Sequence, residues 1–120
     1  MPAEFEAVFA ALKTVLKKHE RTLKILKDEP QEYTLVTKSN SNRRQPMWFG
    51  SVRAGKAYVS YHLMPLYFNP AMNAMVSAGL KKRMQGKTCF NFTSVDKELF
   101  VELKTLTQAA VDDCRKRELL

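Results

Sequence analysis

The spacing of apolar residues changes twice along this chain, and this change constrains the fold more than any other feature. At both ends, apolar residues recur every three or four positions, which is typical of amphipathic helices. Between the ends, runs rich in aromatic and β-branched residues alternate with polar ones, which is typical of strands. A helix at each end of a set of antiparallel hairpins predicts a two-layer α+β fold. We expect an antiparallel sheet of about five strands with both long helices on one face.

The two long helices are expected at the ends of the chain. The first runs from Glu4 to about His19 and has the apolar stripe Phe5, Val8, Phe9, Leu12, Val15 and Leu16. The second begins at Thr93 or Ser94, ends near Arg117, and has the stripe Leu99, Phe100, Leu103, Leu106, Ala110, Val111 and Cys114.

Shorter elements are expected between these helices. Two strands joined by the turn DEPQ are predicted over residues 23–38, although a first helix that continues to Leu26 fits the same apolar residues. Residues 69–86 predict one or two short helices, and residues 87–92 predict a last strand. No linker divides the sequence, so we expect a single domain over residues 1–120.

The clearest hairpin is MWFGSVRAGKAYVSYHLM, residues 47–64, in which Gly55 can supply the positive φ that a short hairpin loop needs. If Val52 pairs with Ala57, strand alternation divides the side chains of the hairpin into two sets. The apolar set is expected beneath the helices and consists of Trp48, Val52, Ala57, Val59, Tyr61 and Leu63. We therefore expect Trp48 and Phe90 to be largely buried, in contact with Leu12, Leu16, Leu103 and Leu106.

The opposite set of hairpin side chains is more aromatic than a plain solvent-facing sheet requires. A contiguous apolar patch on an outer sheet face indicates a partner or ligand surface, which we assign to Phe49, Tyr58, Ser60, His62 and Met64. The alternative is that a loop or the short helical segment covers this patch. His62 and Met64 point the same way, as ligands of a soft metal do. Because His19 is the only other histidine, a structural role for His62 is favoured.

The charge balance is strongly basic. The formal net charge of +8 and a pI of about 9.7 favour acidic partners, such as acidic proteins, nucleotides or nucleic acid. The candidate anion-binding segment surrounds Gly86 and contains Lys81, Lys82, Arg83 and Lys87. The alternative is that this segment is a solvated run of charge, and that the basic balance serves solubility alone.

Motifs of the common enzyme classes are absent from the sequence. It contains no GxSxG, HExxH, GxGxxG or Walker motif, so an enzyme is not indicated. Cys89 and Cys114 match no zinc, haem or redox spacing, and we expect both to be free thiols. Because the N-terminus lacks a basic signal region and no apolar run is long enough to span a bilayer, we expect a cytoplasmic protein without membrane contact.

Two stretches of the chain, MWFGSVRAGKAYVSYHLMPLY and LKKRMQGKTCFNF, resemble the YdhG-like conserved-domain family of small bacterial proteins. The resemblance extends from about Lys24 through the final helix. The family is related to the Bacillus frataxin-like iron chaperone Fra, and frataxin-like domains pack two helices on one face of an antiparallel sheet. The resemblance therefore implies a small non-enzymatic binding protein that handles iron, or an iron-loaded partner, through its outer sheet face. The alternative function is an anion or nucleic-acid binding module that uses the basic surface.

In frataxins, iron binding is tied to acids on the first helix and first strand. The acids in that region of this chain are Glu4, Glu6, Glu20, Asp28, Glu29 and Glu32. The resemblance makes Asp28, Glu29 and Glu32 the candidate metal ligands, since iron prefers carboxylate oxygens. Basic residues are interspersed with these acids and oppose cation binding, so we expect iron to bind weakly.

Overall fold

The computed structural model describes residues 3–38 and 47–117. The chain forms an α+β fold whose elements follow the order helix, strands, short helices, strands, helix. The elements are α1 (Ala3–Lys17), β1 (Lys24–Glu29), β2 (Glu32–Val36), β3 (Trp48–Ala54), β4 (Val59–Leu63), α2 (Pro65–Phe68), the 3-10 helix η1 (Pro70–Met75), α3 (Ala78–Lys81), β5 (Met84–Gln85), β6 (Cys89–Phe92) and α4 (Lys97–Lys116).

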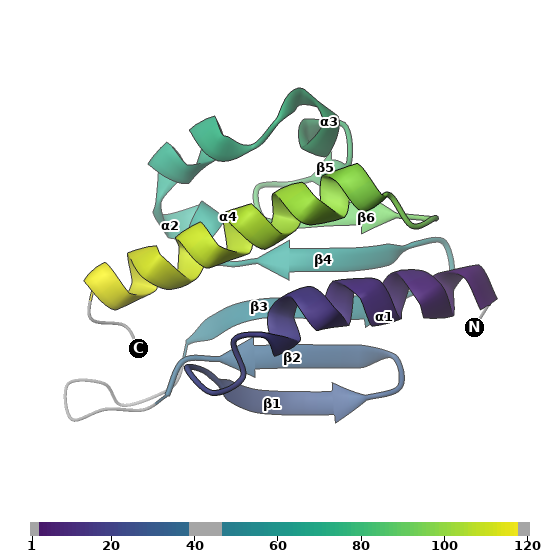
Figure 1. The fold of residues 1–120 in the computed structure, drawn as a ribbon, viewed down its shortest axis with the longest axis horizontal. Helices are drawn as coiled ribbons and strands as arrows, with labels where there is room; N and C mark the ends of the chain where they lie inside the picture. The colour runs from purple at the N-terminus through teal and green to yellow at the C-terminus, as the bar shows by residue number, and fades with distance from the viewer. Residues whose placement is uncertain (1–2, 39–46, 118–120) are drawn as a thin grey trace.

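The strands form one antiparallel sheet in the order β1-β2-β3-β4-β6-β5, and α1 and α4 lie side by side on one face of it (Figure 1). The expected two-layer α+β class is confirmed. The sheet has six strands where about five were expected. The additional strand is β5, two residues at the sheet edge that pair with β6, in a segment whose spacing predicted a helix.

The connections at the two long helices differ in detail from the expectation. After α1 ends at Lys17, the backbone N–H of Leu23 donates to the carbonyl of His19 at 3.0 Å, and Leu23 is buried. This turn ends the helix, so the alternative of a helix that continues to Leu26 is wrong. At α4 the capping residue is Asp96, whose carboxylate accepts the backbone N–H of Leu99 at 3.0 Å. The helix therefore begins later than the expected Thr93 or Ser94.

The core lies between the helices and the sheet. Leu12 and Leu16 of α1 and Leu103 and Leu106 of α4 are buried there, and the expected burial of Phe90 is confirmed. The Phe92 and Phe100 rings meet edge to face with their centroids 4.9 Å apart. The short helices α2, η1 and α3 extend this layer beside α4 (Figure 1), with Met72, Val76 and Leu80 buried.

The expected positions of Trp48 and Phe49 are wrong, and each takes the face assigned to the other. Leu35 pairs with Gly50 and the next residue, Val36, pairs with Trp48, so Phe49 is the extra residue of a β-bulge. A bulge inserts one residue and reverses the alternation before it. Phe49 is therefore fully buried in the core, while Trp48 is 43% exposed on the opposite face.

The β3–β4 hairpin also has a different register from the expected one. Val52 pairs with Tyr61 instead of Ala57, and Ala57 and Tyr58 lie in the connecting loop. The register differs by an even number of residues, so the face assignment of β4 survives: Val59, Tyr61 and Leu63 are buried beneath the helices as expected. Among the described glycines, positive φ occurs at Gly86 (φ 76°), so the expectation of positive φ at Gly55 is wrong.

Two further findings concern properties of the whole described chain. Neither Cys89 nor Cys114 forms a disulfide within the described residues. Within residues 3–38 and 47–117, no helix has the length and apolar character needed to cross a bilayer.

Candidate functional site

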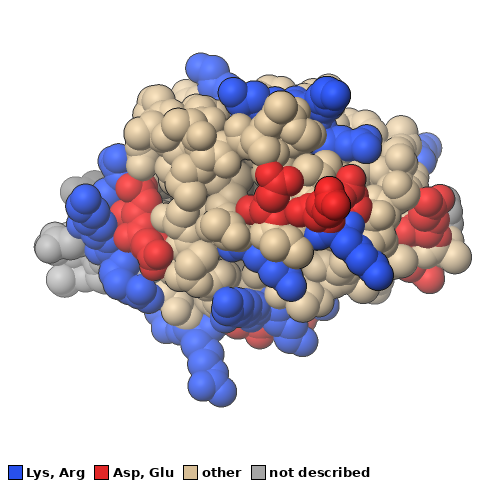
Figure 2. All heavy atoms as spheres, turned by 45° about the horizontal axis from the view of Figure 1, so that its top comes forward, with Lys and Arg blue, Asp and Glu red and all other residues tan. Residues whose placement is uncertain are grey.

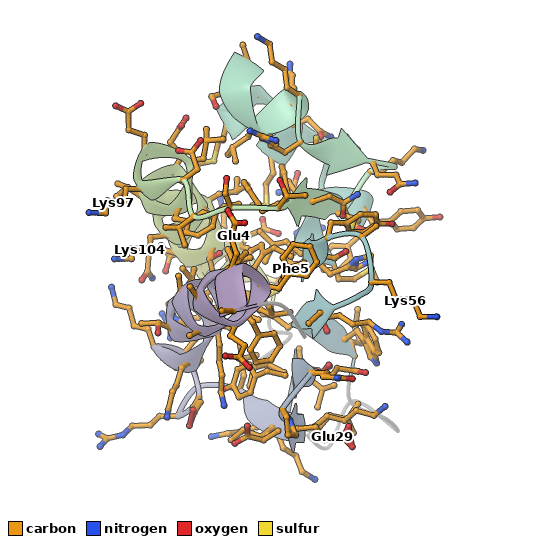
Figure 3. All side chains as sticks on the ribbon, turned by 90° about the vertical axis from the view of Figure 1, so that its right-hand side faces the viewer. Glu4, Phe5, Glu29, Lys56, Lys97 and Lys104 are labelled. Carbon is orange, nitrogen blue, oxygen red and sulfur yellow. The ribbon has the colours of Figure 1, made fainter. Side chains whose placement is uncertain are left out.

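The sheet face opposite α1 and α4, which we call the outer face, is lined by two rows of polar residues that run across four strands. Neighbouring members of each row are directly paired across β2, β3, β4 and β6. The first row is Glu32, Arg53, Ser60 and Asn91, and the second row is Thr34, Ser51, His62 and Cys89. In Figure 3 the helices lie to one side of the sheet, and the outer face is the other side. The pairing brings side chains from distant parts of the sequence within contact distance.

Hydrogen bonds connect most of these side chains. The hydroxyls of Thr34 and Ser51 lie 2.9 Å apart, and Thr34 Oγ1 donates to Glu32 Oε2 at 3.1 Å. Ser60 Oγ donates to Asn91 Oδ1 at 3.0 Å, and Thr88 Oγ1 lies 2.9 Å from His62 Nε2. Such a network fixes the rotamers of its members, and the outer face is therefore a preorganised polar surface.

A depression of about 240 Å³ lies over the centre of this network. We call it the outer depression; it is lined by Glu32, Trp48, Ser51, Arg53, Ser60, His62 and Cys89. The Trp48 ring stands edge-on to the His62 ring, with the centroids 6.5 Å apart. Arg53 is exposed, and its guanidinium has no hydrogen bond or ion pair within the described residues. Glu32, its cross-strand neighbour, is instead paired with Lys27 at 3.6 Å. Trp48 and Arg53 are thus the groups of the depression that stay available to a ligand.

His62 and Cys89 are cross-strand partners, but their surroundings do not activate the thiol. Burial raises the pKa of the Cys89 thiol and lowers the pKa of the His62 imidazole. Both groups are therefore neutral near pH 7, whereas a nucleophilic cysteine needs a depressed pKa and a charged neighbour. The arrangement favours binding over thiolate chemistry.

The three candidate metal ligands are not all brought together. Asp28 is held by Lys13, whose Nζ lies 2.8 Å from Asp28 Oδ1, on the side of β1 that faces α1. Glu29 pairs across the β1–β2 hairpin with Glu32, and successive strand residues point to opposite faces. Within the described residues, no group of three or more His, Cys, Asp or Glu side chains is arranged to hold a metal ion. Asp28 therefore lies apart from Glu29 and Glu32, and the three carboxylates do not converge on one point.

The candidate anion-binding residues lie at the sheet edge formed by β5. Lys81 ends α3, Lys82 caps it, and Gly86 makes the turn that follows β5. Arg83 lies over the Phe92 ring at 6.0 Å, and Lys87 lies over the Tyr67 ring at 5.9 Å. All four basic side chains are exposed, but the two cation–π contacts direct Arg83 and Lys87 to different rings.

The expected partner surface is found only in part. Ser60 and His62 line the outer depression, Phe49 is in the core, and Met64 lies at the start of α2. Tyr58 is in the hairpin loop, where its hydroxyl donates to Gln85 Oε1 at 3.3 Å. Sequence reasoning missed Trp48 and Arg53. The alternation of Ser51 and Arg53 in SVRA is a signal that places Arg53 on the outer face. The bulge that exposes Trp48 has no comparable signal.

Comparisons with known proteins add no assignment. Neither a scan against protein-family models nor searches of curated proteins and solved structures give a match to this chain.

Proposed function

We propose that this protein is a small non-enzymatic binding protein that takes up an acidic segment of a partner protein in the outer depression. The observation that carries the proposal is that an exposed tryptophan and an arginine without an ion-pair partner in the described chain line the same preformed hollow. Tryptophan and arginine are among the residues most enriched at binding hot spots. The partner segment would place an apolar side chain against Trp48 and a carboxylate against Arg53.

Two further features support an acidic partner. The net charge of +8 attracts acidic surfaces at long range and speeds their encounter. Guanidinium groups bind carboxylates through two parallel hydrogen bonds, which fixes the orientation of the bound group. The hydrogen-bonded serine, threonine and asparagine side chains around the depression give it a rigid floor, which lowers the entropic cost of binding.

The single tryptophan of the chain makes this proposal directly testable. A panel of peptides that carry aspartate or glutamate beside an apolar residue should shift Trp48 emission, and the same peptides with lysine in place of the acid should not. In polarisation assays with labelled peptides, Arg53→Gln should weaken binding about tenfold or more, as at a hot spot. Arg21→Gln removes the same charge from an exposed turn and should leave affinity unchanged. If no acidic peptide shifts the emission, or if both variants weaken binding equally, the proposal is wrong.

The candidate anion-binding segment around Gly86 has a second candidate function, the binding of single-stranded nucleic acid. Its supporting observation is the contact of Lys87 with the Tyr67 ring, because Tyr67 is 64% exposed. An exposed ring beside cations is the usual platform for stacking a base next to a bound phosphate. Tyr67→Ala and Lys82→Gln should each reduce affinity for a single-stranded oligonucleotide. Only the lysine change should also reduce the dependence of affinity on salt.

Membership of the YdhG-like family and a frataxin-like role are proposals that rest on the two sequence stretches quoted for the resemblance. Iron handling by this chain would then depend on a partner protein that brings the metal. Anaerobic titration with ferrous ion tests this point: we expect no saturable binding to the isolated chain, and tight stoichiometric binding would contradict the geometry at Asp28.

A further inference from the structure

A second hollow lies on the helix side of the molecule, between the end of α1 and the middle of α4. It has a volume of about 380 Å³ and is lined by Thr14, Val15, Lys17, Lys18, His19 and Lys104. An adjoining hollow of about 450 Å³ shares Lys18 and Lys104 with it. Pockets of this size hold small-molecule ligands. We call the first of them the helix hollow.

The helix hollow is electropositive. Lys17, Lys18 and Lys104 are exposed at its walls, and none of the three has an ion pair within the described part of the chain. Asp112 lines the adjoining hollow, but its carboxylate accepts from Gln108 Nε2 at 3.1 Å and lies 3.8 Å from Arg115. Figure 2 shows both basic and acidic groups on the surface in this view. Three ammonium groups around one hollow repel one another, and a bound anion would remove that repulsion.

His19 gives the hollow a buried polar group. Its side chain is only 7% exposed and lines the hollow, and its ring makes no hydrogen bond within the described residues. No fully buried side-chain nitrogen or oxygen lacks a partner there, so the ring nitrogens reach the open space of the hollow. An imidazole whose nitrogens open into a cavity can form a hydrogen bond with a ligand that enters it. Burial and the nearby Lys18 lower the pKa of His19, while Asp112 opposes this effect and Arg115 adds to it. Near pH 7 the ring is therefore neutral and can donate one N–H.

The C-terminal end of a helix normally repels anions because its carbonyls are unpaired. At α1 the last carbonyls are occupied: Leu16 O accepts the backbone N–H of His19 at 2.9 Å, and Lys17 O accepts that of Glu20 at 3.1 Å. The turn after α1 thus reduces the repulsion that unpaired carbonyls would exert on an anion at the end of α1.

We propose that the helix hollow binds a small phosphate-bearing molecule, with Lys18 of the turn after α1 and Lys104 of α4 contacting the phosphate from opposite sides and His19 donating a hydrogen bond to it. One phosphate group occupies only part of about 380 Å³, so the ligand is a diphosphate or a phosphate ester with a further group over Val15. The site lies on the opposite side of the sheet from the outer depression and does not depend on the function proposed there.

The two histidines of the chain provide an internal control, because His19 lies in the helix hollow and His62 lies on the outer face. Proton NMR of their ring resonances should be followed during titration with pyrophosphate, and separately with phenyl phosphate, at constant ionic strength. We expect saturable shifts of His19 and an increase of its pKa on binding, with His62 unchanged. Tighter binding of one probe decides between a diphosphate and a phosphate ester.

Matched lysine variants test whether the hollow, and not the overall charge, binds the anion. Lys104→Gln should weaken pyrophosphate binding about fivefold or more, since one ammonium contact is lost. Lys97→Gln makes the same change two turns earlier on α4, where the side chain leaves the helix on the same side but does not line the hollow (Figure 3). It should change the affinity less than twofold. Melting curves of both variants should match that of the unmodified protein, because both side chains are exposed.

Two results would overturn the proposal. One is the absence of a saturable His19 shift with either probe. The other is an equal loss of affinity in the two lysine variants, which would show that only the net charge attracts the anion.

Discussion

The two sides of the sheet satisfy their polar groups in different ways. On the outer face, hydroxyl and amide side chains bond one another, as Ser60 does with Asn91, and Trp48 and Arg53 stay exposed above them. In the helix hollow, lysines gather without carboxylate partners among the described residues, and His19 has an unbonded ring. The comparison teaches that the basic charge of this protein is not uniform. The outer face offers oriented contacts suited to selective recognition, and the helix hollow offers concentrated charge suited to a small anion.

The largest effect on stability is expected at the bulge, where Phe49 faces the core and Trp48 faces outward. Phe49→Ala should lower the free energy of unfolding by about 3–5 kcal/mol, because it empties a fully buried site. Trp48→Ala should cost about 1 kcal/mol or less, since its side chain is 43% exposed. Urea denaturation of the two neighbours measures the difference. Equal losses, or a larger loss for Trp48, would mean that the strand has no bulge at this point.

A smaller effect is expected at a hydroxyl pair that joins the sheet to α4 within the core. Tyr61 OH and Thr107 Oγ1 are hydrogen-bonded, and both residues are fully buried. Tyr61→Phe should lower the free energy of unfolding by about 1 kcal/mol, the usual cost of one lost hydrogen bond. Tyr67→Phe is the control, because the Tyr67 side chain is largely exposed and its change should be without effect. A neutral Tyr61→Phe would show that Thr107 finds another hydrogen-bond partner at no cost.

A weaker contribution is expected from the ion pair that occupies a candidate metal ligand. Asp28→Asn removes the ion pair between Asp28 and Lys13, whose side chains are 52% and 27% exposed, respectively. The change should lower the free energy of unfolding by about 0.5 kcal/mol. The loss should decrease with added salt, because exposed charges are screened. Glu29→Gln is the matched control on the same strand, with no ion pair in the described chain. A large, salt-independent loss for Asp28→Asn would contradict the exposed geometry.

The last prediction concerns pH and compares the two histidines. Burial lowers the pKa of His62 below its ordinary value of 6.5, so below that pH the unfolded chain binds more protons than the folded one. The contribution of the neutral His62 ring to the free energy of unfolding should therefore be fully present above about pH 6.5. It should be lost as the pH falls through this value toward the folded pKa. The pKa of His19 is also lowered, so His19 likewise makes the folded protein less stable as the pH falls. Urea midpoints on either side of about pH 6.5 should show a shallow slope, which His62→Gln reduces. A slope of opposite sign would mean that the folded state stabilises the charged ring.

Much of the fold was predictable because the long helices and β4 have regular apolar spacing. The stripes from Phe5 to Leu16 and from Phe100 to Cys114 are buried as expected, and so are Val59, Tyr61 and Leu63. The candidate site was less predictable, because its residues come from four strands and their register decides which of them meet. His62 and Cys89 are neighbours only because β4 pairs with β6.

The sequence by itself determined the order of the two long helices and the five longer strands, the α+β class and the basic charge, because these depend on local spacing and composition. Only the tertiary structure decided that Trp48 faces outward and Phe49 inward. That reversal comes from a bulge against β2, and Gly50, where an added Cβ would lie 3.0 Å from Leu16 Cδ2, lets α1 pack closely beside it. Only the packing of α1 against α4 brings Lys18 and Lys104 to one hollow. Contacts between residues far apart in the chain are fixed by register and packing, which local periodicity does not encode.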